Sequence, residues 1–216
     1  MNSIAFIKFG KKEHIESLVN EGKLFLNTVT EFKKIDDNYR GDKNEGASHL
    51  LQSAHARIEI RLPEEIRKEP LILDSSNGLI GQIVMSFGEY SGKNIYSLYM
   101  LEASESASID SRMEQFGEYA AFIHNPKEFL NRVESKLKQS NISFEAGQVS
   151  YIDEQSFEGD LSLFKKFSAY KYQNEYRILI SSKKNEPFIL NIGPINDIAY
   201  ALPVEIFHSM KISRIR

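Results

Sequence analysis

Three polar side chains at the start of an apolar segment have types and spacing that suit chemistry. Gln173, Glu175 and Arg177 occupy every second position, and the β-branched and aromatic run from Tyr176 to Ile180 is typical of a strand. Because strand side chains alternate between faces, an extended conformation that begins early predicts the three on one face. The same pattern fits an edge strand with a Glu–Arg surface pair, so both interpretations stand at this point.

A basic and aromatic run, residues 164–172, precedes this segment and reads Phe-Lys-Lys-Phe-Ser-Ala-Tyr-Lys-Tyr. Aromatic rings can stack on bases while cations contact phosphates, which makes Lys171, Tyr172 and Arg177 candidate contacts to a nucleic-acid substrate. An amphipathic strand pair with rings inward and lysines in water fits equally well. The net charge of −3 means that nucleic-acid binding requires a local basic patch.

The composition is that of an ordinary globular protein, and its 216 residues suit a single domain, 1–216. There is no cysteine, which excludes disulfides, a cysteine nucleophile and thiolate metal sites. The N-terminus lacks the apolar core of a signal peptide, and no apolar run approaches the roughly 20 residues of a transmembrane helix. We therefore expect a cytoplasmic protein with no membrane partner.

Hydrophobic periodicity and turn residues predict the elements that position these side chains. The first part of the chain predicts a strand at 4–9, a helix at 11–20, a strand at 23–27 and a helical turn at 28–35 that carries Phe32 inward. Residues 36–48 are polar and contain two glycines, which predicts a long loop. Its Arg40, Asp42 and Glu45 either form a polar wall of a ligand cleft or stay solvated.

The rest of the chain is richer in strands than in helices. Residues 49–101 predict an antiparallel meander with a short helix at 63–68 and a hairpin turn at Ser75-Ser76-Asn77-Gly78. Residues 102–118 are predicted to form a flexible loop, and Asn125 is predicted to cap a helix over 126–139. The predicted fold class is therefore α+β, with mostly antiparallel twisted sheet. The remaining predictions are strands at 119–123, 144–152, 188–192 and 195–202 and a short helix at 204–210.

Familiar catalytic signatures are missing from the sequence. It contains no H-E-x-x-H motif, phosphate-binding loop, dinucleotide fingerprint or nucleophile elbow. Of the five histidines only His49 and His55 are close, and on a strand that spacing separates them by about 20 Å. We expect no metal site.

Gln173-x-Glu175 at the start of a late strand resembles the Q/E-x-E motif of ADP-ribosyltransferases. The rest of the chain resembles DUF2971-type bacterial proteins, in which a strand, a helix, a second strand and a polar loop precede a meander and a late aromatic-rich segment. The resemblance spans most of the chain and is sharpest in its last segment. It implies an ADP-ribosyltransferase-like fold in a toxin or anti-phage defence module. The segments that carry it are 6–10, 22–27 with Phe32, 40–46, 116–120 and 172–177.

The resemblance implies NAD as a substrate and assigns roles to individual residues. Glu175 would stabilise the oxocarbenium-like ribose and hold its 2′-hydroxyl, and Gln173 would orient the acceptor. In the family the first strand usually supplies Arg or His, where this chain has Lys8 or Phe9. The family's second-strand Ser-Thr-Ser is replaced by Asn27-Thr28-Val29-Thr30. The implied NAD-binding residues are Lys8, Phe9, Gly10, Asn27, Thr28, Phe32 or Tyr39 for stacking, and Arg40 for the pyrophosphate.

These observations predict an NAD-dependent ADP-ribosyltransferase that modifies a macromolecular acceptor, either protein or nucleic acid, with a slight preference for RNA or DNA. An antitoxin or other inhibitory protein is a further expected partner. The alternative is a non-catalytic module on the same fold that binds nucleotides, nucleic acid or a partner protein. In that case loops 36–48 and 102–118 are contact surfaces.

Overall fold

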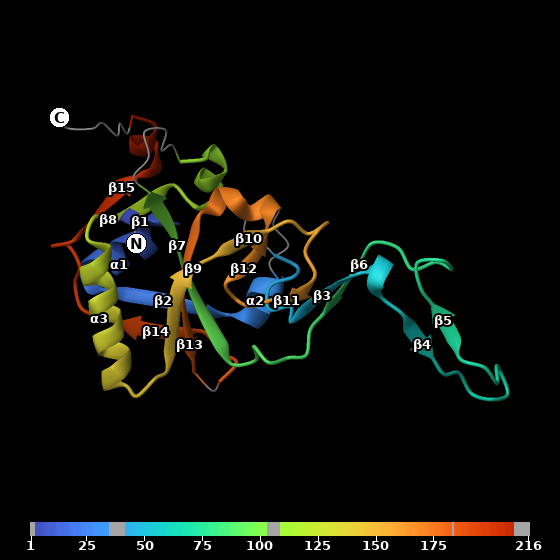
Figure 1. Cartoon of the computed structure of the whole chain (residues 1–216). Helices are drawn as coiled ribbons and strands as arrows, with labels where there is room; N and C mark the ends of the chain where they lie inside the picture. Colours follow the sequence, from blue (N-terminus) through green and yellow to red (C-terminus); the bar gives the residue numbers. More distant parts are fainter. Residues whose placement is uncertain (1–2, 35–41, 103–108, 183, 210–216) are drawn as a thin grey trace.

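An eight-stranded antiparallel sheet forms the centre of the molecule (Figure 1). The computed structural model describes residues 3–34, 42–102, 109–182 and 184–209. The fold is α+β with mostly antiparallel sheets, as the sequence predicts. The strands of the central sheet are β1 (Ser3–Gly10), β2 (Lys23–Thr28), β7 (Lys93–Glu102), β8 (Tyr119–Ile123), β9 (Phe144–Gln148), β13 (Glu175–Ser181), β14 (Phe188–Asn191) and β15 (Ala199–Pro203).

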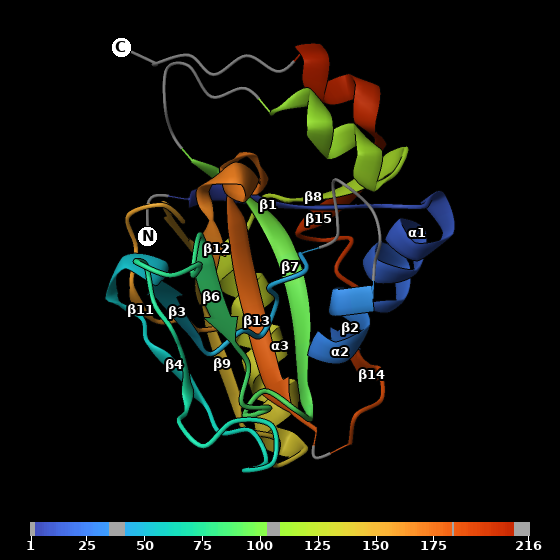
Figure 2. The ribbon, with the colours of Figure 1, turned by 90° about the vertical axis from the view of Figure 1, so that its right-hand side faces the viewer.

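Strand β7 organises this sheet because it pairs with three other strands, β1, β2 and β13. One edge pairs with β13 over residues 93–99. The other edge pairs with β2 at Asn94 and Ile95 and with β1 from Tyr99 onward. Residues 96–98 on that second edge have no strand partner among the described strands. Strands β1 and β2 therefore diverge along β7 (Figure 2).

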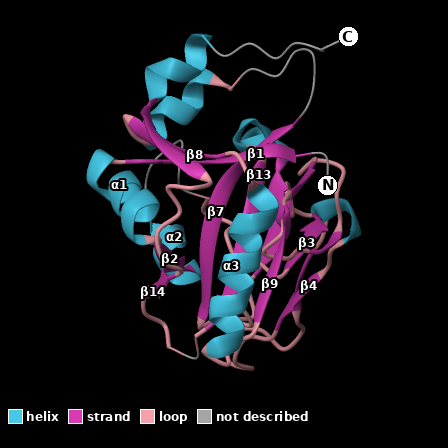
Figure 3. Cartoon of the chain, turned by 90° about the vertical axis from the view of Figure 1, so that its left-hand side faces the viewer, coloured by secondary structure: helices cyan, strands magenta, loops and turns pink. Residues whose placement is uncertain are grey.

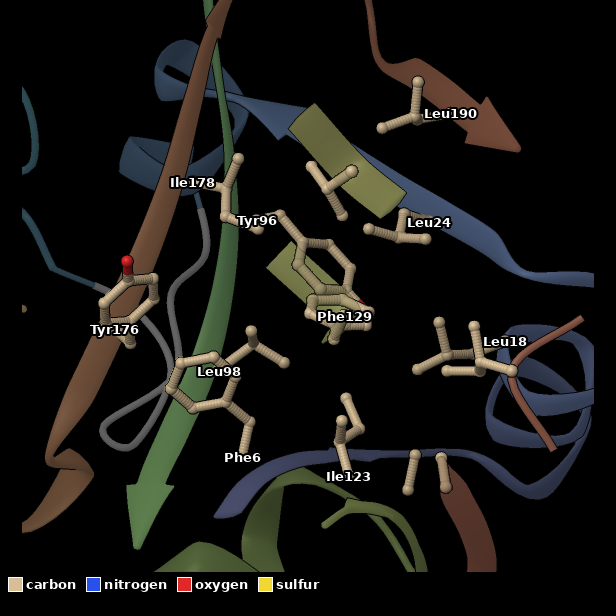
Figure 4. Packing of buried hydrophobic residues seen from close by; sticks show 14 of the residues in the cluster. Phe6, Leu18, Leu24, Tyr96, Leu98, Ile123, Phe129, Tyr176, Ile178 and Leu190 are labelled. Atoms are coloured by element: carbon tan, nitrogen blue, oxygen red, sulfur yellow. The ribbon is translucent and has the colours of Figure 1, made fainter. Parts of the chain in front are cut away.

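One face of the sheet is covered by helices α1 (Lys12–Glu21) and α3 (Pro126–Gln139). Figure 3 shows α3 crossing over β7, β13 and β9. The spacing of Phe129, Val133 and Leu137 puts all three on one side of α3, where they are buried. They join the main hydrophobic core (Figure 4), which includes Phe6, Leu18, Leu24, Tyr96, Leu98, Ile123, Tyr176, Ile178 and Leu190.

Local signals define both helices. Asn125 accepts a hydrogen bond from the backbone N–H of Glu128, so α3 starts where the sequence predicts. Helix α1 ends at Gly22, whose φ of 69° is left-handed. A Cβ there would lie 1.7 Å from the carbonyl oxygen of Gly193, so the site also excludes any side chain. None of the described helices is long and apolar enough to cross a membrane.

The opposite face of the sheet is covered by short elements. A second apolar cluster there joins Ile7, Phe9 and Tyr99 to Met113 and Phe207. Met113 lies in the short 3₁₀ helix η2 (Ser111–Phe116), so the described end of the predicted 102–118 loop is structured. Residues 103–108 lie outside the described part. The elements on this side are α2 (Val29–Lys34), η2, η3 (Ser168–Gln173), η4 (Val204–Ser209) and the parallel strands β10 (Ser150–Ile152) and β12 (Lys165–Phe167).

Residues 49–85 form an arm of two nested antiparallel pairs that extends away from the sheet (Figure 1). The predicted meander is wrong here, because β5 (Leu71–Leu73) pairs back with β4 (Ile58–Ile60) and β6 (Gln82–Met85) with β3 (His49–Gln52). No hairpin forms across residues 75–78. Residues 63–68 contain a single hydrogen-bonded turn instead of a helix. The arm also contains η1 (Ser53–His55), and β11 (Gly159–Asp160) lies beside β3.

Local hydrogen bonds explain why Asn77-Gly78 does not form a hairpin turn. The Asn77 amide oxygen accepts from the backbone N–H of Asp74, and its nitrogen donates to the carbonyl of Ile72. These bonds close a turn onto the end of β5 itself. The predicted strand at 144–152 also divides, because Val149 N–H donates to the carbonyl of Glu175 while Ser150 N–H donates to that of Phe164.

Candidate functional site

A cavity of about 310 Å³ opens on the sheet face away from the main core, beside the divergence of β1 and β2. The register between β13 and β7 determines which side chains form the floor of this cavity. Glu175 lies opposite Tyr99 and Arg177 opposite Ser97, so these four side chains share a face of the sheet and all line the cavity. Tyr176, between them, points into the main core.

Gln173 reaches the same cavity by a different route from the predicted one. Strand β13 begins at Glu175, while Gln173 ends η3. Asn174 between them has a φ of 33°, and its side chain donates to the carbonyl of Met100. The sequence predicts an extended conformation at Gln173, which is wrong. The left-handed turn at Asn174 nevertheless brings the Gln173 side chain to the predicted side of the sheet, where it lines the cavity.

Glu175 and Arg177 belong to a buried network of charges. The Arg177 guanidinium binds Glu45 through two bonds of 2.7 and 2.8 Å and donates from Nε to Glu175 at 2.7 Å. It also donates to the carbonyl oxygen of Leu163. Lys166 Nζ lies 2.9 Å from Glu175 Oε2 and donates to Gln173 Oε1 at 2.7 Å.

The depth of this network overturns the alternative of a surface pair on an edge strand. Arg177 is 1% exposed and Glu175 is 4% exposed. Strand β13 is paired on both sides, with β7 and with β9. Buried charges persist only when they are paired and hydrogen-bonded, and here each carboxylate meets a cation.

The network determines how its members ionise. Burial by itself raises the pKa of Glu175, but Arg177 and Lys166 outweigh it and hold that pKa far below the ordinary value. Glu175 is therefore a carboxylate at any physiological pH. Burial and the neighbouring Glu45 raise the pKa of Asp42 instead.

Lys8 occupies the place where β7 lacks a strand neighbour. Its Nζ donates to the Ser97 carbonyl oxygen at 2.8 Å and lies 4.5 Å from the centre of the Tyr96 ring. The side chain thus satisfies a carbonyl in the unpaired stretch of β7. Burial lowers the pKa of Lys8 to about 8, although the charge of Glu175 acts in the opposite direction.

A second cavity of about 480 Å³ adjoins the first. It is more apolar, and Phe25 and Ile189, directly opposite each other on β2 and β14, are both 54% exposed. Asn27 lines this second cavity. Both cavities are bordered by Lys8, Phe9, Gly10, His14, Phe32, Ile95 and Ser97, so they form one cleft with a charged lobe and an apolar lobe.

Of the NAD-binding residues named from the resemblance, Lys8, Phe9, Gly10, Asn27 and Phe32 border this cleft, whereas Thr28 does not. Thr28 is 1% exposed, lines neither cavity, and accepts a hydrogen bond from the backbone N–H of Glu31, which caps α2. Tyr39 and Arg40 lie outside the described residues.

The basic and aromatic run does not form an exposed stacking platform. Phe164, Phe167, Tyr170 and Tyr172 each pack against a hydrophobic cluster. Tyr172 is also covered by the guanidinium of Arg112, 3.8 Å from the ring centre. Lys171 and Tyr172 line neither cavity.

Three residues of the cleft floor were missed from sequence, namely Ser97, Tyr99 and Lys166. Ser97 gave no signal, because nothing local marks the point where two strands diverge. Lys166 was grouped with the exposed basic run, yet it is 6% exposed and pairs with Glu175. Its only signal was its place between Lys165 and the buried Phe167, which is too weak to show which lysine points inward.

Comparisons with protein-family models, with curated proteins and with solved structures find nothing that matches this chain. Within the described residues, no three or more His, Cys, Asp or Glu side chains come together as a metal site would require. The site therefore has to be interpreted from its own geometry: an ionised carboxylate beside several cations, at the bottom of a two-lobed cleft.

Proposed function

We propose that this protein is an NAD-dependent ADP-ribosyltransferase with Glu175 as the residue that stabilises the transferred ribose. The observation that carries the proposal is the state of Glu175, a buried carboxylate kept ionised at the floor of a cleft. Cleavage of the nicotinamide–ribose bond develops positive charge on the ribose, and a fixed negative charge in a low-dielectric site stabilises it. An ionised group is needed, since a protonated carboxyl would lack that charge.

The charge and shape of the cleft support a dinucleotide. Arg177 and Lys166 offset the charges of Glu45 and Glu175, so Lys8 and Lys11 leave the first lobe with an excess of positive charge. This balance suits a ligand with a diphosphate, with Lys8 at the junction of the two lobes. The second lobe offers Phe25 and Ile189 to a flat apolar ring, and the volumes are typical of ligand sites.

The chemistry follows from these placements. The bond between ribose C1′ and the nicotinamide nitrogen breaks, and nicotinamide leaves with the bonding electrons. The acceptor's nucleophile then bonds to C1′ and releases its proton to water. Gln173 is neutral and held by Lys166, so it can orient the acceptor but cannot deprotonate it. An acceptor with its own nucleophilicity is therefore expected, either a protein side chain or a nucleic-acid base.

The biological setting rests on the resemblance to DUF2971-type proteins. We propose a cytoplasmic toxin or anti-phage enzyme whose acceptor is a protein or, with a slight preference, RNA or DNA. Such an enzyme needs control inside its own cell, so an inhibitory partner such as an antitoxin belongs to the proposal. The packed rings of residues 164–172 leave the nucleic-acid preference without an exposed aromatic platform.

A second candidate function is favoured by one observation. Both oxygens of Glu175 already contact cations, Oε1 with Arg177 and Oε2 with Lys166. A carboxylate so fully paired serves equally well as the structural base of a nucleotide-binding module without transfer activity. That module would bind NAD or ADP-ribose and release it unchanged.

Replacing Glu175 by Gln separates the two functions. We expect NAD consumption in the presence of cell lysate to fall by about 100-fold or more, because the transition state loses its main electrostatic partner. Glu145→Gln is the matched control, since Glu145 is an exposed carboxylate on the neighbouring strand β9. Circular dichroism verifies that both variants fold.

Glu45→Gln tests whether a loss of activity comes merely from disturbing the charge network. Like Glu175→Gln, it removes one carboxylate partner of Arg177. The transferase proposal predicts a much smaller loss for Glu45→Gln than for Glu175→Gln. Equal losses would indicate a structural role for both. Binding of NAD by the wild-type chain without any release of nicotinamide would establish the non-catalytic module instead.

A further inference from the structure

The arm formed by residues 49–85 has no core of its own beyond its base. From Arg57 to Lys93, no residue is buried. Six of the ten large hydrophobic side chains exposed in the described residues belong to the arm or to its return, at Ile60, Leu62, Ile66, Ile80, Val84 and Phe87. Such a concentration of exposed apolar side chains marks a surface that another molecule covers.

The outer part of the arm is too small to be stable in isolation. Strands β4 and β5 contain three residues each and pair only with each other in the described sheets. A lone two-stranded hairpin is marginal in water. Each of these strands therefore keeps one edge open for another strand.

The open edge of β4 is the better of the two for pairing. Pro70 directly precedes β5 and has no backbone N–H to donate. On β4 the chain runs from Ala56 to Leu62 without a proline, and Pro63 ends it. A partner strand along β4 can thus pair over residues 57–62.

The charge of the arm argues against nucleic acid or an anionic membrane as the partner. Residues 57–69 carry four basic and four acidic side chains, so they have no excess positive charge. The order of these charges is more informative. Arg57, Glu59 and Arg61 alternate with Ile58, Ile60 and Leu62, which gives the strand one charged face and one apolar face.

This alternation is complementary to itself. An antiparallel pairing of two copies about a twofold axis through Ile60 places Glu59 of each copy opposite Arg61 of the other. It also places Ile58 opposite Leu62, and Ile60 opposite itself. Both side chains of the ion pair are accessible, since Glu59 is 44% and Arg61 85% exposed. Opposite charges and apolar pairs at directly opposed positions stabilise antiparallel strands.

Other registers are worse. An axis through Glu59 opposes Glu59 to Glu59 and Arg57 to Arg61. An axis through Ile58 pairs Glu59 with Arg57 but brings Arg61 against His55. A shift of one residue puts charged side chains opposite apolar ones, which breaks both faces.

We propose that the arm is a homodimerisation element, in which β4 of one copy pairs antiparallel with β4 of a second copy in the register centred on Ile60. The product is a four-stranded sheet in the order β5-β4-β4-β5. The paired edge is short, so the dimer is expected to be weak and concentration-dependent. The proposal is independent of the chemistry in the cleft, because no residue of β4 or β5 lines it.

The absence of cysteine from the natural sequence allows a direct test with the full chain carrying Ile60→Cys. Directly opposed residues in antiparallel strands have Cα atoms about 4.5–5.5 Å apart, within the range of about 4.4–6.8 Å that a disulfide needs. Under mild oxidation we expect a covalent dimer, visible on non-reducing gels. Ile80→Cys is the control, because Ile80 is 87% exposed and Ile60 only 37%.

Solvent exposure and the proposed register make opposite predictions about which of the two variants cross-links faster. Random collision would cross-link the Ile80→Cys chain faster, whereas the register centred on Ile60 predicts that Ile60→Cys reacts at least about tenfold faster. Equal rates, a faster reaction at Ile80, or no dimer from Ile60→Cys would overturn the proposal.

A charge exchange then tests the register. Glu59→Arg alone and Arg61→Glu alone, each in the Ile60→Cys chain, oppose like charges at both pairs and should slow cross-linking about tenfold. A mixture of the two variants restores opposite charges at both positions, so mixed dimers should form at the unmodified rate. Failure of Arg61→Glu to slow the reaction, or of the mixture to recover it, would exclude this register.

Discussion

The cleft and the arm reverse the usual distribution of polar and apolar side chains. In the cleft, five charged or amide side chains are at most 6% exposed, namely Glu45, Lys166, Gln173, Glu175 and Arg177. In the arm, apolar side chains lie in water and no residue from Arg57 to Lys93 is buried. Both features lower the free energy of unfolding of an isolated chain, and so each indicates a role other than stability.

The physical consequences differ because the cleft is internally complete and the arm is not. Every charge of the cleft network meets an opposite charge within the molecule, which holds its geometry rigidly before any ligand arrives. The arm has open strand edges and uncovered apolar side chains, so its order depends on another surface. Preorganised sites suit chemistry, whereas incomplete ones suit association.

The largest expected effect in this comparison is the loss of Arg177. Arg177→Met leaves Glu45 and Glu175 buried without their shared cation, and we expect the free energy of unfolding to fall by about 3–5 kcal/mol. Arg67→Met, at an exposed position of the arm, is the matched control and should change it by less than about 0.5 kcal/mol. Urea unfolding monitored by circular dichroism measures both. Similar effects at the two positions would abolish the distinction between the regions.

Lys8 gives a smaller effect that depends on pH. Its pKa in the folded protein is about 8, below the ordinary value of 10.5, so between these pH values the unfolded chain holds a proton that the folded chain has released. The Lys8 contribution to the free energy of unfolding is therefore unfavourable below pH 8 and improves as pH rises, by up to about 1.4 kcal/mol per pH unit.

Lys8→Met removes this pH dependence. The difference between wild type and variant, measured by urea unfolding from pH 7.5 to 10, should change in favour of the wild type as pH rises. Groups that titrate in both proteins cancel in that difference. A flat difference would mean that the amine is solvated and that the cleft does not desolvate Lys8 as the structure indicates.

Removal of the arm is expected to have the smallest effect. Joining Ser53 to Gly81 through an Asn-Gly turn deletes residues 54–80 and keeps β3 paired with β6. Since the deleted segment contributes almost nothing buried, the free energy of unfolding of the dilute protein should change by less than about 1 kcal/mol. Hydrogen exchange in β7 and β13 should be unchanged. A drop of several kcal/mol would show that the arm supports the body.

The sequence by itself determined the elements whose signals are local. Helix α3 follows from Asn125 and the spacing of Phe129, Val133 and Leu137, and its bounds agree with the prediction. Strand β8 also agrees, and β1, α1 and β2 differ by one residue at their ends. Caps, turns and periodicity act within a few residues, so a single sequence contains them.

Part of the site was also accessible from sequence. Gln173 and Glu175 were named from strand alternation, and Lys8 and Phe32 from the family resemblance; all four border the cleft. Thr28 was placed correctly along the chain but assigned a ligand, whereas its hydroxyl caps α2. A hydroxyl at a strand end gives no sign of which hydrogen bond it makes.

Only the tertiary structure decided which segments meet. Glu45 reaches Arg177 across 132 positions of the chain, and Lys166 turns inward to Glu175. The return of β5 to β4 and the divergence of β1 from β2 along β7 are likewise choices of partner and register. Periodicity states which side of a strand is apolar but not which strand lies beside it, and that pairing created both the buried charges of the cleft and the open edge of the arm.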